Sequence, residues 1–321
     1  MIIIFNSHDR PDKNFYHLTG IEEPCSGVLV FDDRPVVLAS SLESSIAEKY
    51  VETIELKSNK QLWNEIAQRA KDKLELNFSR LSADKLVKLK KLGKIKDISA
   101  KLEQDRMIKT KKEQIKLTKA AEIANRVGKK LPDMIQPGKT ENELAAELEF
   151  LARRLGASGV SFPTIVASGP NSASIHHRAG DRTIQAGDTI VVDFGPIYKL
   201  YTADVTRSFV IGRNKEAEQE YQKLQAVFET VVDRLEQGVR LAELSELTTE
   251  LSMPHSLGHG IGLDVHEAPQ ISDKSELSLE TGMVFTIEPG NYGKTGIRIE
   301  DNFIMDKQLK KLTKISKEFV I

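Results

Sequence analysis

The sequence predicts an α+β protein in which a small α/β domain precedes a larger region built from two related helix-helix-sheet halves. Three observations predict this fold class. The chain has 321 residues, 40% of them hydrophobic, so it is long enough for two domains with their own cores. Short β-rich runs alternate with helical stretches near the N-terminus. A motif near residue 135 then recurs 100 residues later.

The N-terminal region alternates between strand and helix patterns. The strand candidates are residues 2–5, 27–31, 35–39, 51–56 and 74–78, and the helix candidates are 43–49, 61–71 and 83–92. Strands that alternate with helices are typical of a small α/β domain.

A lysine-rich stretch follows, with 13 Lys or Arg and four acidic side chains between residues 85 and 119. It leads into a long helical pattern. A polyanion-binding surface would need these cations on one face, and aromatic side chains between them would let nucleobases stack. No aromatic residue lies within this stretch. We therefore interpret it as a solvated linker and helix surface, and nucleic acid is not an expected partner.

The second region contains an internal sequence repeat. Residues 135–148, IQPGKTENELAAEL, match residues 235–248, LEQGVRLAELSELT, so that Gly138 aligns with Gly238. This repetition predicts two halves with related folds. Such pseudo-symmetry commonly places a functional site where the halves join.

Each half begins with a long helical pattern, at residues 112–134 or 216–237, and continues after the glycine turn with a shorter helix. Thr140 and Glu143 have the spacing of a capping box at the start of the first short helix. β-rich segments follow in both halves. The order of elements is therefore helix, helix, sheet, twice.

Composition excludes several classes of protein. The 46 basic and 47 acidic side chains nearly cancel, so no overall field draws the chain to nucleic acid or to a membrane. Cys25 is the only cysteine, which excludes an internal disulfide and suits a reducing compartment. The apolar start is typical of a first strand and not of a signal peptide. No run of about 18 apolar residues occurs, so we expect a cytoplasmic protein without membrane association.

Asp193 is unusual because it lies in an apolar strand candidate, residues 190–195. Burying a carboxylate is costly unless the charge is paired or binds a metal. Asp204 follows in a similar segment, and a hairpin turning near Tyr198 and Lys199 would place the two aspartates opposite one another, with Cβ atoms about 4.5 to 5.5 Å apart. Asp204 alone would be interpreted as part of a polar strand face. Together the two like charges predict a cation between them.

Further candidate ligands lie near the C-terminus. Glu288 ends an apolar run, and Glu300 lies in the strand-like GIRIEDNFIM. His259 lies in HSLGHGIGLDVHE, where the glycines argue against a helix and allow backbone to approach the imidazole closely. Each of these residues alone would be interpreted as a surface residue. Together, four carboxylates and one neutral imidazole balance the charge of two divalent cations, and a bridging hydroxide would complete the coordination. The grouping therefore predicts a two-metal centre for Mn²⁺, Fe²⁺, Co²⁺ or Zn²⁺.

In these motifs the chain resembles the proline-specific metallopeptidases of the methionine aminopeptidase and prolidase superfamily, which have the pita-bread fold. The motif H-x-x-G-H-x-x-G-x-x-x-H-E is complete from His255 to Glu267. The family's ligand order is matched by Asp193, Asp204, His259, Glu288 and Glu300. The resemblance covers about residues 106–321 and implies a pita-bread catalytic domain there. Residues 1–105, through NFYHLTGI, more weakly resemble the domain that precedes it in prolidases.

The resemblance implies roles for these residues. The five matched ligands would hold two divalent ions per subunit, with Mn²⁺ or Co²⁺ ahead of Fe²⁺ or Zn²⁺. Glu288 would also move a proton, while His176 and His266 would stabilise the intermediate and contact the substrate. The implied substrate-binding residues are His255, Arg298, Phe162 and Ile165, the last two as walls of a proline pocket.

The implied activity is hydrolysis of Xaa-Pro bonds in small peptides, through a hydroxide bridging two metal ions, by a cytoplasmic homodimer. An Xaa-Pro dipeptidase (prolidase) is the preferred interpretation. Aminopeptidase P, which acts on longer Xaa-Pro peptides, and a catalytically inactive peptide- or protein-binding relative are the alternatives. The chain departs from the family pattern at Ile175 and His177, and in a short segment between Gly238 and His255. These departures concern the substrate pocket and leave the metal ligands unchanged.

Overall fold

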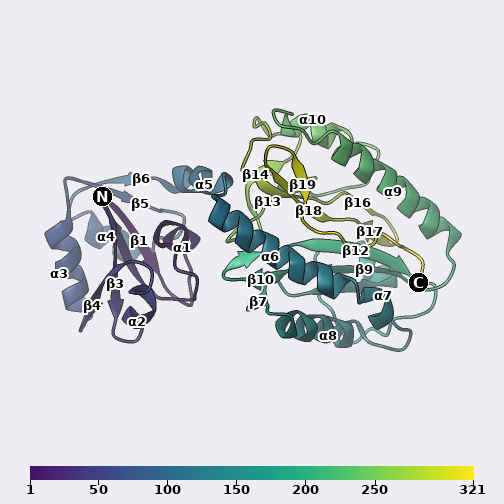
Figure 1. The fold of residues 1–321 in the computed structure, drawn as a ribbon, viewed down its shortest axis with the longest axis horizontal. Helices are drawn as coiled ribbons and strands as arrows, with labels where there is room; N and C mark the ends of the chain where they lie inside the picture. Colours follow the sequence, from purple (N-terminus) through teal and green to yellow (C-terminus); the bar gives the residue numbers. More distant parts are fainter. The chain divides into compact units, whose positions relative to one another are not determined.

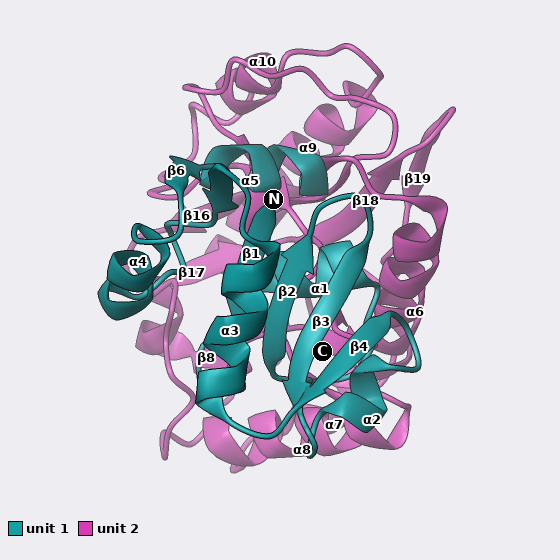
Figure 2. Ribbon diagram, turned by 90° about the vertical axis from the view of Figure 1, so that its left-hand side faces the viewer, with its two compact units in different colours: residues 1–106 teal, residues 107–321 magenta.

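The computed structural model describes residues 1–321, which divide into two compact units, Met1–Arg106 and Met107–Ile321 (Figure 2). Buried apolar side chains form a core within each unit. None of the helices combines the length and the apolar composition that crossing a bilayer requires. The α+β fold class is confirmed.

The first unit contains one mixed sheet of six strands, in the order β4-β3-β2-β1-β5-β6 (Figure 1). Its strands are β1 (Ile2–Asn6), β2 (Gly27–Phe31), β3 (Pro35–Ser40), β4 (Glu52–Leu56), β5 (Lys73–Leu76) and β6 (Lys94–Asp97). Its helices are α1 (Lys13–Thr19), α2 (Ser44–Ala47), α3 (Asn59–Arg69) and α4 (Ala83–Leu89), and α5 (Ser99–Met107) lies at its end. Strand β1 pairs antiparallel with β2 and parallel with β5.

The predicted strands and helices of this unit are confirmed, with small shifts at their ends. Three elements, α1, α5 and β6, were not predicted. Helix α1 is short and begins at Asp12, whose side chain accepts a hydrogen bond from the backbone N–H of Asn14, and it ends at Gly20 with a left-handed φ of 73°. Strand β6 lies inside the lysine-rich stretch, where its exposed side chains hide the alternation that marks a strand.

The second unit places its sheets between long helices. In Figure 1 its strands lie between α9 on one side and α6 and α8 on the other. The helices are α6 (Lys111–Gly128), α7 (Leu131–Met134), α8 (Glu141–Arg154), α9 (Lys215–Asp233) and α10 (Leu241–Glu246), with a 3-10 helix, η1 (Gly169–Ala173). The cores of the two halves are formed separately, one beneath α6 and α8 and the other beneath α9.

The strands of this unit form a three-stranded sheet β12-β9-β8, a five-stranded sheet β14-β13-β15-β18-β19 and two smaller sheets, β11-β10-β7 and β16-β17. In chain order they are β7 (Gly159–Val160), β8 (Ile165–Ser168), β9 (Thr189–Phe194), β10 (Pro196–Tyr198), β11 (Tyr201–Thr202), β12 (Val205–Val210), β13 (Gly258–Gly260), β14 (Glu267–Ile271), β15 (Val284–Ile287), β16 (Gly290–Tyr292), β17 (Gly296–Arg298), β18 (Asp301–Met305) and β19 (Leu309–Lys311).

The internal repeat of the sequence corresponds to a repeat in the structure. Gly138 and Gly238 both have φ of 91°, a left-handed value that favours glycine. Their N–H groups donate to the carbonyl oxygens of Ile184 and Leu279, at 2.9 and 2.8 Å. Matching isolated bridges follow, Thr140 with Thr183 and Arg240 with Ser278. The predicted pair of related halves is therefore confirmed.

The helices of the two halves differ in detail from the prediction. The stretch predicted as one helix, residues 112–134, is divided into α6 and α7, because Pro132 begins a new helix more readily than it continues one. Thr140 and Glu143 form the predicted capping box of α8, with both reciprocal hydrogen bonds present.

The hairpin that carries the two aspartates has a different register from the predicted one. Its turn is at Lys199 and Leu200, which both have positive φ, 47° and 70°, as two-residue hairpin turns require. Asp193 consequently pairs with Thr206 and not with Asp204. The prediction of directly opposed aspartates was wrong because the turn lies one residue later than expected. Asp204 lies two positions before Thr206, immediately before β12 begins.

Candidate metal centre

A cavity of about 140 Å³ in the second unit brings together nearly all the residues predicted for the site. Its lining consists of Phe162, Pro163, Ile165, Ile175, His176, His177, Arg178, Asp193, Asp204, His259, His266, Glu288, Arg298 and Glu300. His255 is the one predicted residue outside the lining. Its Nδ1 lies 3.9 Å from Glu288 Oε2, and its Nε2 lies 3.2 Å from the Tyr292 hydroxyl, so it contacts the cavity through its neighbours.

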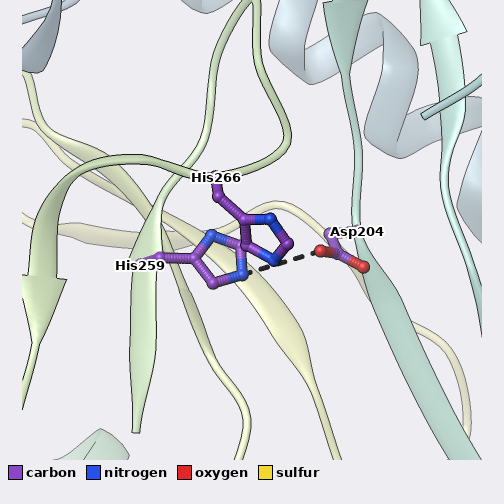
Figure 3. A group of neighbouring side chains, drawn as sticks. All are labelled: Asp204, His259 and His266. Atoms are coloured by element: carbon purple, nitrogen blue, oxygen red, sulfur yellow. Dashed lines mark ion pairs between the residues drawn. The ribbon is translucent and has the colours of Figure 1, made fainter. Parts of the chain in front are cut away.

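The five predicted ligands lie on or next to strands of the second unit. Asp193 is on β9, Asp204 precedes β12, His259 is the middle residue of β13, Glu288 follows β15, and Glu300 lies between β17 and β18. Their ligand atoms form overlapping groups, each within 4.8 Å: Asp193, Asp204 and Glu300, then His259, Glu288 and Glu300. Asp204, His259 and His266 form a third such group, and Figure 3 shows both imidazoles beside the Asp204 carboxylate.

Glycines let His259 reach this position. A Cβ atom on Gly258 would lie 2.1 Å from the carbonyl oxygen of Thr286, and one on Gly260 would lie 2.2 Å from that of Ala268. Strand β13 therefore tolerates no side chain on either side of His259. The close backbone approach expected from the sequence is confirmed.

The tautomer of His259 follows from its contacts. Its Nδ1 lies 3.1 Å from the Gly260 carbonyl oxygen, which only accepts, so Nδ1 carries the proton. Burial lowers the pKa of His259 to about 3, with the nearby His266 adding to the shift, so the ring is neutral. Nε2 then presents a lone pair 3.4 Å from Glu288 Oε1 and 3.7 Å from Asp204 Oδ2. Three acceptors facing one another require a proton or a cation between them.

The carboxylates among the predicted ligands also lie close together with too few positive groups to pair with them. Burial, followed by the charge of nearby carboxylates, raises the pKa of Asp204 and Glu300 well above the usual range. Burial likewise raises the pKa of Glu288 to about 8. One oxygen each of Asp193, Asp204 and Glu300 is buried without a hydrogen-bond donor. Buried carboxylate oxygens rarely lack donors, so three in one place fit cation ligands.

Arg298 lines the cavity, but its donors go to protein groups. Its NH2 donates to Asp193 Oδ2 at 2.7 Å, its Nε to Thr206 Oγ1 at 3.0 Å, and its NH1 to the Tyr292 hydroxyl at 2.6 Å. Thr206 in turn donates to Glu300 Oε2 at 2.8 Å. Arg298 and Thr206 thus hold Asp193 and Glu300 in fixed orientations. Sequence reasoning missed Tyr292, whose only signal is an aromatic hydroxyl four residues after Glu288.

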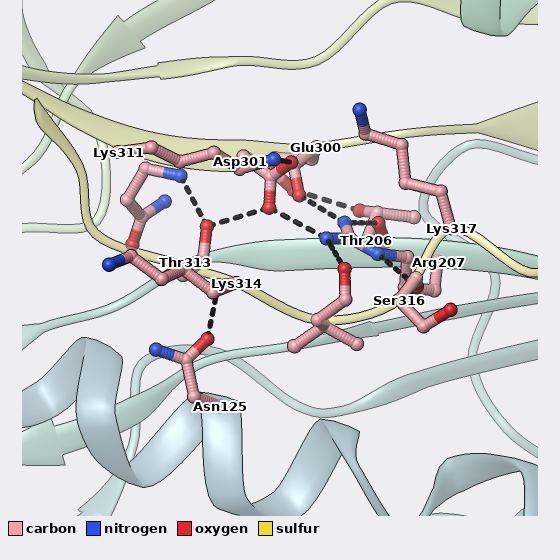
Figure 4. A network of polar contacts seen from close by, with 12 residues as sticks. Asn125, Thr206, Arg207, Glu300, Asp301, Lys311, Thr313, Lys314, Ser316 and Lys317 are labelled. Atoms are coloured by element: carbon pink, nitrogen blue, oxygen red, sulfur yellow. Dashed lines mark hydrogen bonds and ion pairs between the residues drawn. The ribbon is translucent and has the colours of Figure 1, made fainter. Parts of the chain in front are cut away.

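A second buried arginine fixes the backbone on which Glu300 stands (Figure 4). Arg207 is fully buried, and its NH1 donates to the carbonyl oxygens of Thr206 and Glu300 at 2.8 and 2.7 Å. Its NH2 pairs with Asp301 Oδ1 at 2.7 Å and also donates to Ile315. A buried ion pair is tolerated when its remaining donors are satisfied, as they are here. The network therefore joins β12, β18 and the C-terminal segment beneath the site.

The remaining predicted residues form the walls and rim of the cavity. Phe162 and Ile165, with Pro163 and Ile175, supply an apolar wall. His176 and His266 are exposed imidazoles at the rim, and the His266 ring centroid lies 4.4 Å from that of His259. Burial, and then the nearby His176, lowers the pKa of His266. The cavity thus combines an acidic cluster, an apolar wall and several imidazoles.

Comparisons with known proteins point to one family. The profile of metallopeptidase family M24 matches residues 115–307. An Xaa-Pro dipeptidase of Pyrococcus furiosus is 32% identical over 334 residues, covering 98% of this chain and 96% of that protein. Among solved structures, an X-Pro aminopeptidase from Thermotoga maritima is similar with a TM-score of 0.92 and 31% identity, covering 100% of this chain and 97% of the other. An Xaa-Pro dipeptidase from Bacillus anthracis has a TM-score of 0.91 at 29% identity, covering 100% and 94%.

Proposed function

The chain belongs to metallopeptidase family M24, and from this premise we propose that it is an Xaa-Pro dipeptidase, which hydrolyses the bond before a carboxyl-terminal proline. The observation that carries the proposal is the single cavity in which the five candidate ligands meet beside an apolar wall. The cluster could hold metal ions that polarise the scissile carbonyl, and the wall can contact a proline ring. The similarity to the dipeptidase of Pyrococcus furiosus supports the same substrate class.

The donor set suits two divalent cations held by Asp193, Asp204, His259, Glu288 and Glu300. Four carboxylates and one neutral imidazole favour Mn²⁺ or Co²⁺, with Fe²⁺ or Zn²⁺ as alternatives. When bound, the ions would supply Lewis acidity that acidifies a water molecule and polarises the scissile carbonyl.

The protein's own groups would orient the substrate and move protons. Glu288, with 17% of its side chain exposed to the cavity, is placed to take a proton from the attacking water and to pass it to the leaving proline nitrogen. His176 and His266 at the rim can donate hydrogen bonds to the carbonyl oxygen as it gains charge. Phe162 and Ile165 would pack against the proline ring. His255 would support this arrangement through Glu288.

Two alternatives have definite signatures. Aminopeptidase P activity on longer Xaa-Pro peptides is favoured by the similarity to the Thermotoga maritima aminopeptidase structure. A catalytically inactive peptide-binding protein would lack one or more ligands, whereas this chain has all five. A dipeptidase is preferred because the catalytic cavity is small.

The proposal is tested with metal-stripped protein reloaded with Mn²⁺, Co²⁺ or Zn²⁺. Leu-Pro and Met-Pro should be cleaved faster than Leu-Pro-Gly, and Asp193→Asn should remove activity while circular dichroism remains unchanged. Faster cleavage of Leu-Pro-Gly would establish the aminopeptidase instead. Absence of cleavage with every metal, in folded protein that binds two ions, would disprove the peptidase proposal.

We also propose that residues 1–105 and 106–321 are separate domains and that the protein is a cytoplasmic homodimer. The two compact units support the first proposal, and the family resemblance supports the second. Thermal melting of residues 106–321 expressed alone should be cooperative. Light scattering of the full chain should give twice the monomer mass of 35.9 kDa.

A further inference from the structure

The first unit contains a cavity of about 470 Å³ that has no part in the proposed function. It lies at the carboxyl ends of parallel strands, because its lining includes Asn6, Ser40 and Leu56, the last residues of β1, β3 and β4. The beginning of α3 and one face of α4 form its other sides. In open α/β sheets, crevices beyond the carboxyl ends of the strands are common sites for small ligands.

The path of the chain explains why a crevice lies there. Strands β1, β2, β3 and β4 follow one another across the sheet, and α3 then carries the chain back to β5, on the other side of β1. The order of the strands therefore reverses beside β1. Connections on the two sides of such a reversal diverge and leave a gap at the ends of the strands. The cavity lies at this gap, next to the ends of β1 to β4.

The floor of the cavity is apolar and partly aromatic. Val28 and Leu38 are buried there, and Leu62 of α3 is half-buried beside them. Phe5 and Trp63 also line the cavity, with ring centroids 6.0 Å apart and ring planes 35° apart. Both rings are only partly buried. Because aromatic rings favour offset and edge contacts with one another, a third ring in the cavity would have two partners.

Lysines give the cavity a positive charge. Lys57, Lys85 and Lys88 line it together with a single acidic residue, Asp84. Asp84 lies close enough to Lys85 to interact with its charge, so it offsets one of the three charges at most. None of the three lysines forms an ion pair with a carboxylate. A bound anion would therefore pair with cations that the protein itself leaves without a counterion.

The two lysines of α4 lie directly beside the aromatic pair. Lys85 Nζ is 4.6 Å from the centroid of the Phe5 ring, and Lys88 Nζ is 4.8 Å from that of Trp63. Residues three apart on a helix lie on the same face, so both ammonium groups are directed to the same side of the cavity. An ammonium group that contacts a ring keeps donors for other partners, since it has three. One anionic group can thus accept from both lysines.

From these features we propose that the cavity binds a small aromatic anion, a flat ring that carries a carboxylate or a phosphate. The ring would pack on the apolar floor beside Phe5 and Trp63, and the anionic group would lie between Lys85 and Lys88. An apolar ligand without charge would leave the lysines unpaired, whereas an inorganic anion would leave the floor uncovered. The site is separate from the metal centre, which belongs to the second unit.

Trp63 is the only tryptophan of the chain, so its fluorescence reports on this cavity. Full-length protein loaded with Mn²⁺ would be titrated with phenylacetate, phenyl phosphate, phenylacetamide and acetate. Both aromatic anions should change the emission in a saturable way, and the tighter of them identifies the preferred anionic group. Phenylacetate should bind about fivefold more tightly than phenylacetamide, which has the same shape without the charge. Acetate, which lacks the ring, should leave the emission unchanged.

Variants locate the binding. Lys85→Gln and Lys88→Gln should each weaken binding of phenylacetate toward that of phenylacetamide, and Lys88→Arg should restore it because the charge is kept. Lys90→Gln is the matched control, since Lys90 is also exposed on α4 but lies outside the lining. Calorimetry would measure the same affinities without the fluorophore, and circular dichroism would confirm that each variant is folded.

Three results would overturn the proposal. They are the absence of saturable binding by either aromatic anion, equal affinity for phenylacetate and phenylacetamide, and unchanged discrimination in the double variant Lys85→Gln/Lys88→Gln. None of these measurements involves turnover. The result therefore stands whether or not the protein cleaves Leu-Pro.

Discussion

Each unit contains a buried aspartate, Asp12 or Asp204, and the two carboxylates differ in the hydrogen bonds that they accept. In the first unit Asp12 is 2% exposed, and its carboxylate accepts hydrogen bonds from the Asn14 backbone and side chain and from Asn77, at 3.0, 2.9 and 2.8 Å. In the second unit Asp204 is 5% exposed, has an oxygen without a donor and lies among other carboxylates. Burial alone therefore does not identify a functional carboxylate. A functional carboxylate is better identified by a buried oxygen that lacks a hydrogen-bond donor, when neighbouring carboxylates also have such oxygens.

Replacing each aspartate with asparagine in turn tests most directly whether Asp204 is functional and Asp12 is not. Asp204→Asn should reduce kcat/KM for Leu-Pro by more than about 10³-fold, because a ligand to the proposed ions is lost. Asp12→Asn should retain near wild-type activity. Steady-state kinetics with Mn²⁺ present would measure both. Comparable losses in the two variants would show that Asp204 is no more functional than Asp12.

Metal removal should affect stability with a definite dependence on pH. Without cations, burial raises the pKa of Glu288 to about 8 and also raises those of Asp204 and Glu300. The folded protein then retains protons that the unfolded chain has released, so its stability falls between the ordinary carboxylate pKa, about 4.5, and about pH 8. Bound cations remove this penalty. The melting temperature of chelated protein should therefore fall from pH 5 to pH 8, while that of Mn²⁺-loaded protein should fall less.

Asp204→Asn should change stability in the direction opposite to its effect on activity. Removing one of several repelling carboxylates should raise the melting temperature of the metal-free protein. By contrast Asp12→Ala should cost about 1 to 3 kcal/mol, because the N-cap of α1 is lost and the Asn77 amide loses its acceptor. Urea denaturation of both variants in chelator would measure these changes. A destabilised Asp204→Asn variant would contradict the account of mutual repulsion.

The smallest expected effect concerns Cys25 in the first unit. Burial, and then the charge of Glu43, raises the pKa of this thiol to about 12, so it stays protonated at pH 8. Labelling by a disulfide reagent should be slow in folded protein and rapid in urea. Its rate should not change when metal is removed, because the ions belong to the second unit. A clear acceleration on chelation would show that the two units do not respond separately.

Most of the candidate site could be proposed from the sequence. Asp193 was recognisable because a charge in an apolar strand is costly wherever the strand lies. The glycines around His259 indicated a close approach of backbone, which the structure has. The hairpin register was not recognisable, because a shift of the turn by one residue costs little in local sequence preference. The division of the first long helix at Pro132, and the short helix α1 between Asp12 and Gly20, follow from capping and proline signals that the pattern of apolar residues does not record.

Tyr292 was missed for a related reason. It is not unusual in its local segment, since a tyrosine beside a glycine is an ordinary surface residue. Its importance comes from its contacts with Arg298 and His255 beside the cavity, and a linear pattern does not record such contacts.

The matched glycine turns at Gly138 and Gly238 have a consequence for how the molecule could be divided. The segment after the first turn provides Asp193 and Asp204, and the segment after the second provides His259, Glu288 and Glu300. Neither copy of the repeat contains all five candidate ligands. Cutting the chain in the turn before α9 would leave two fragments that bind ions well only after they reassociate, so metal uptake would serve as a readout of their docking.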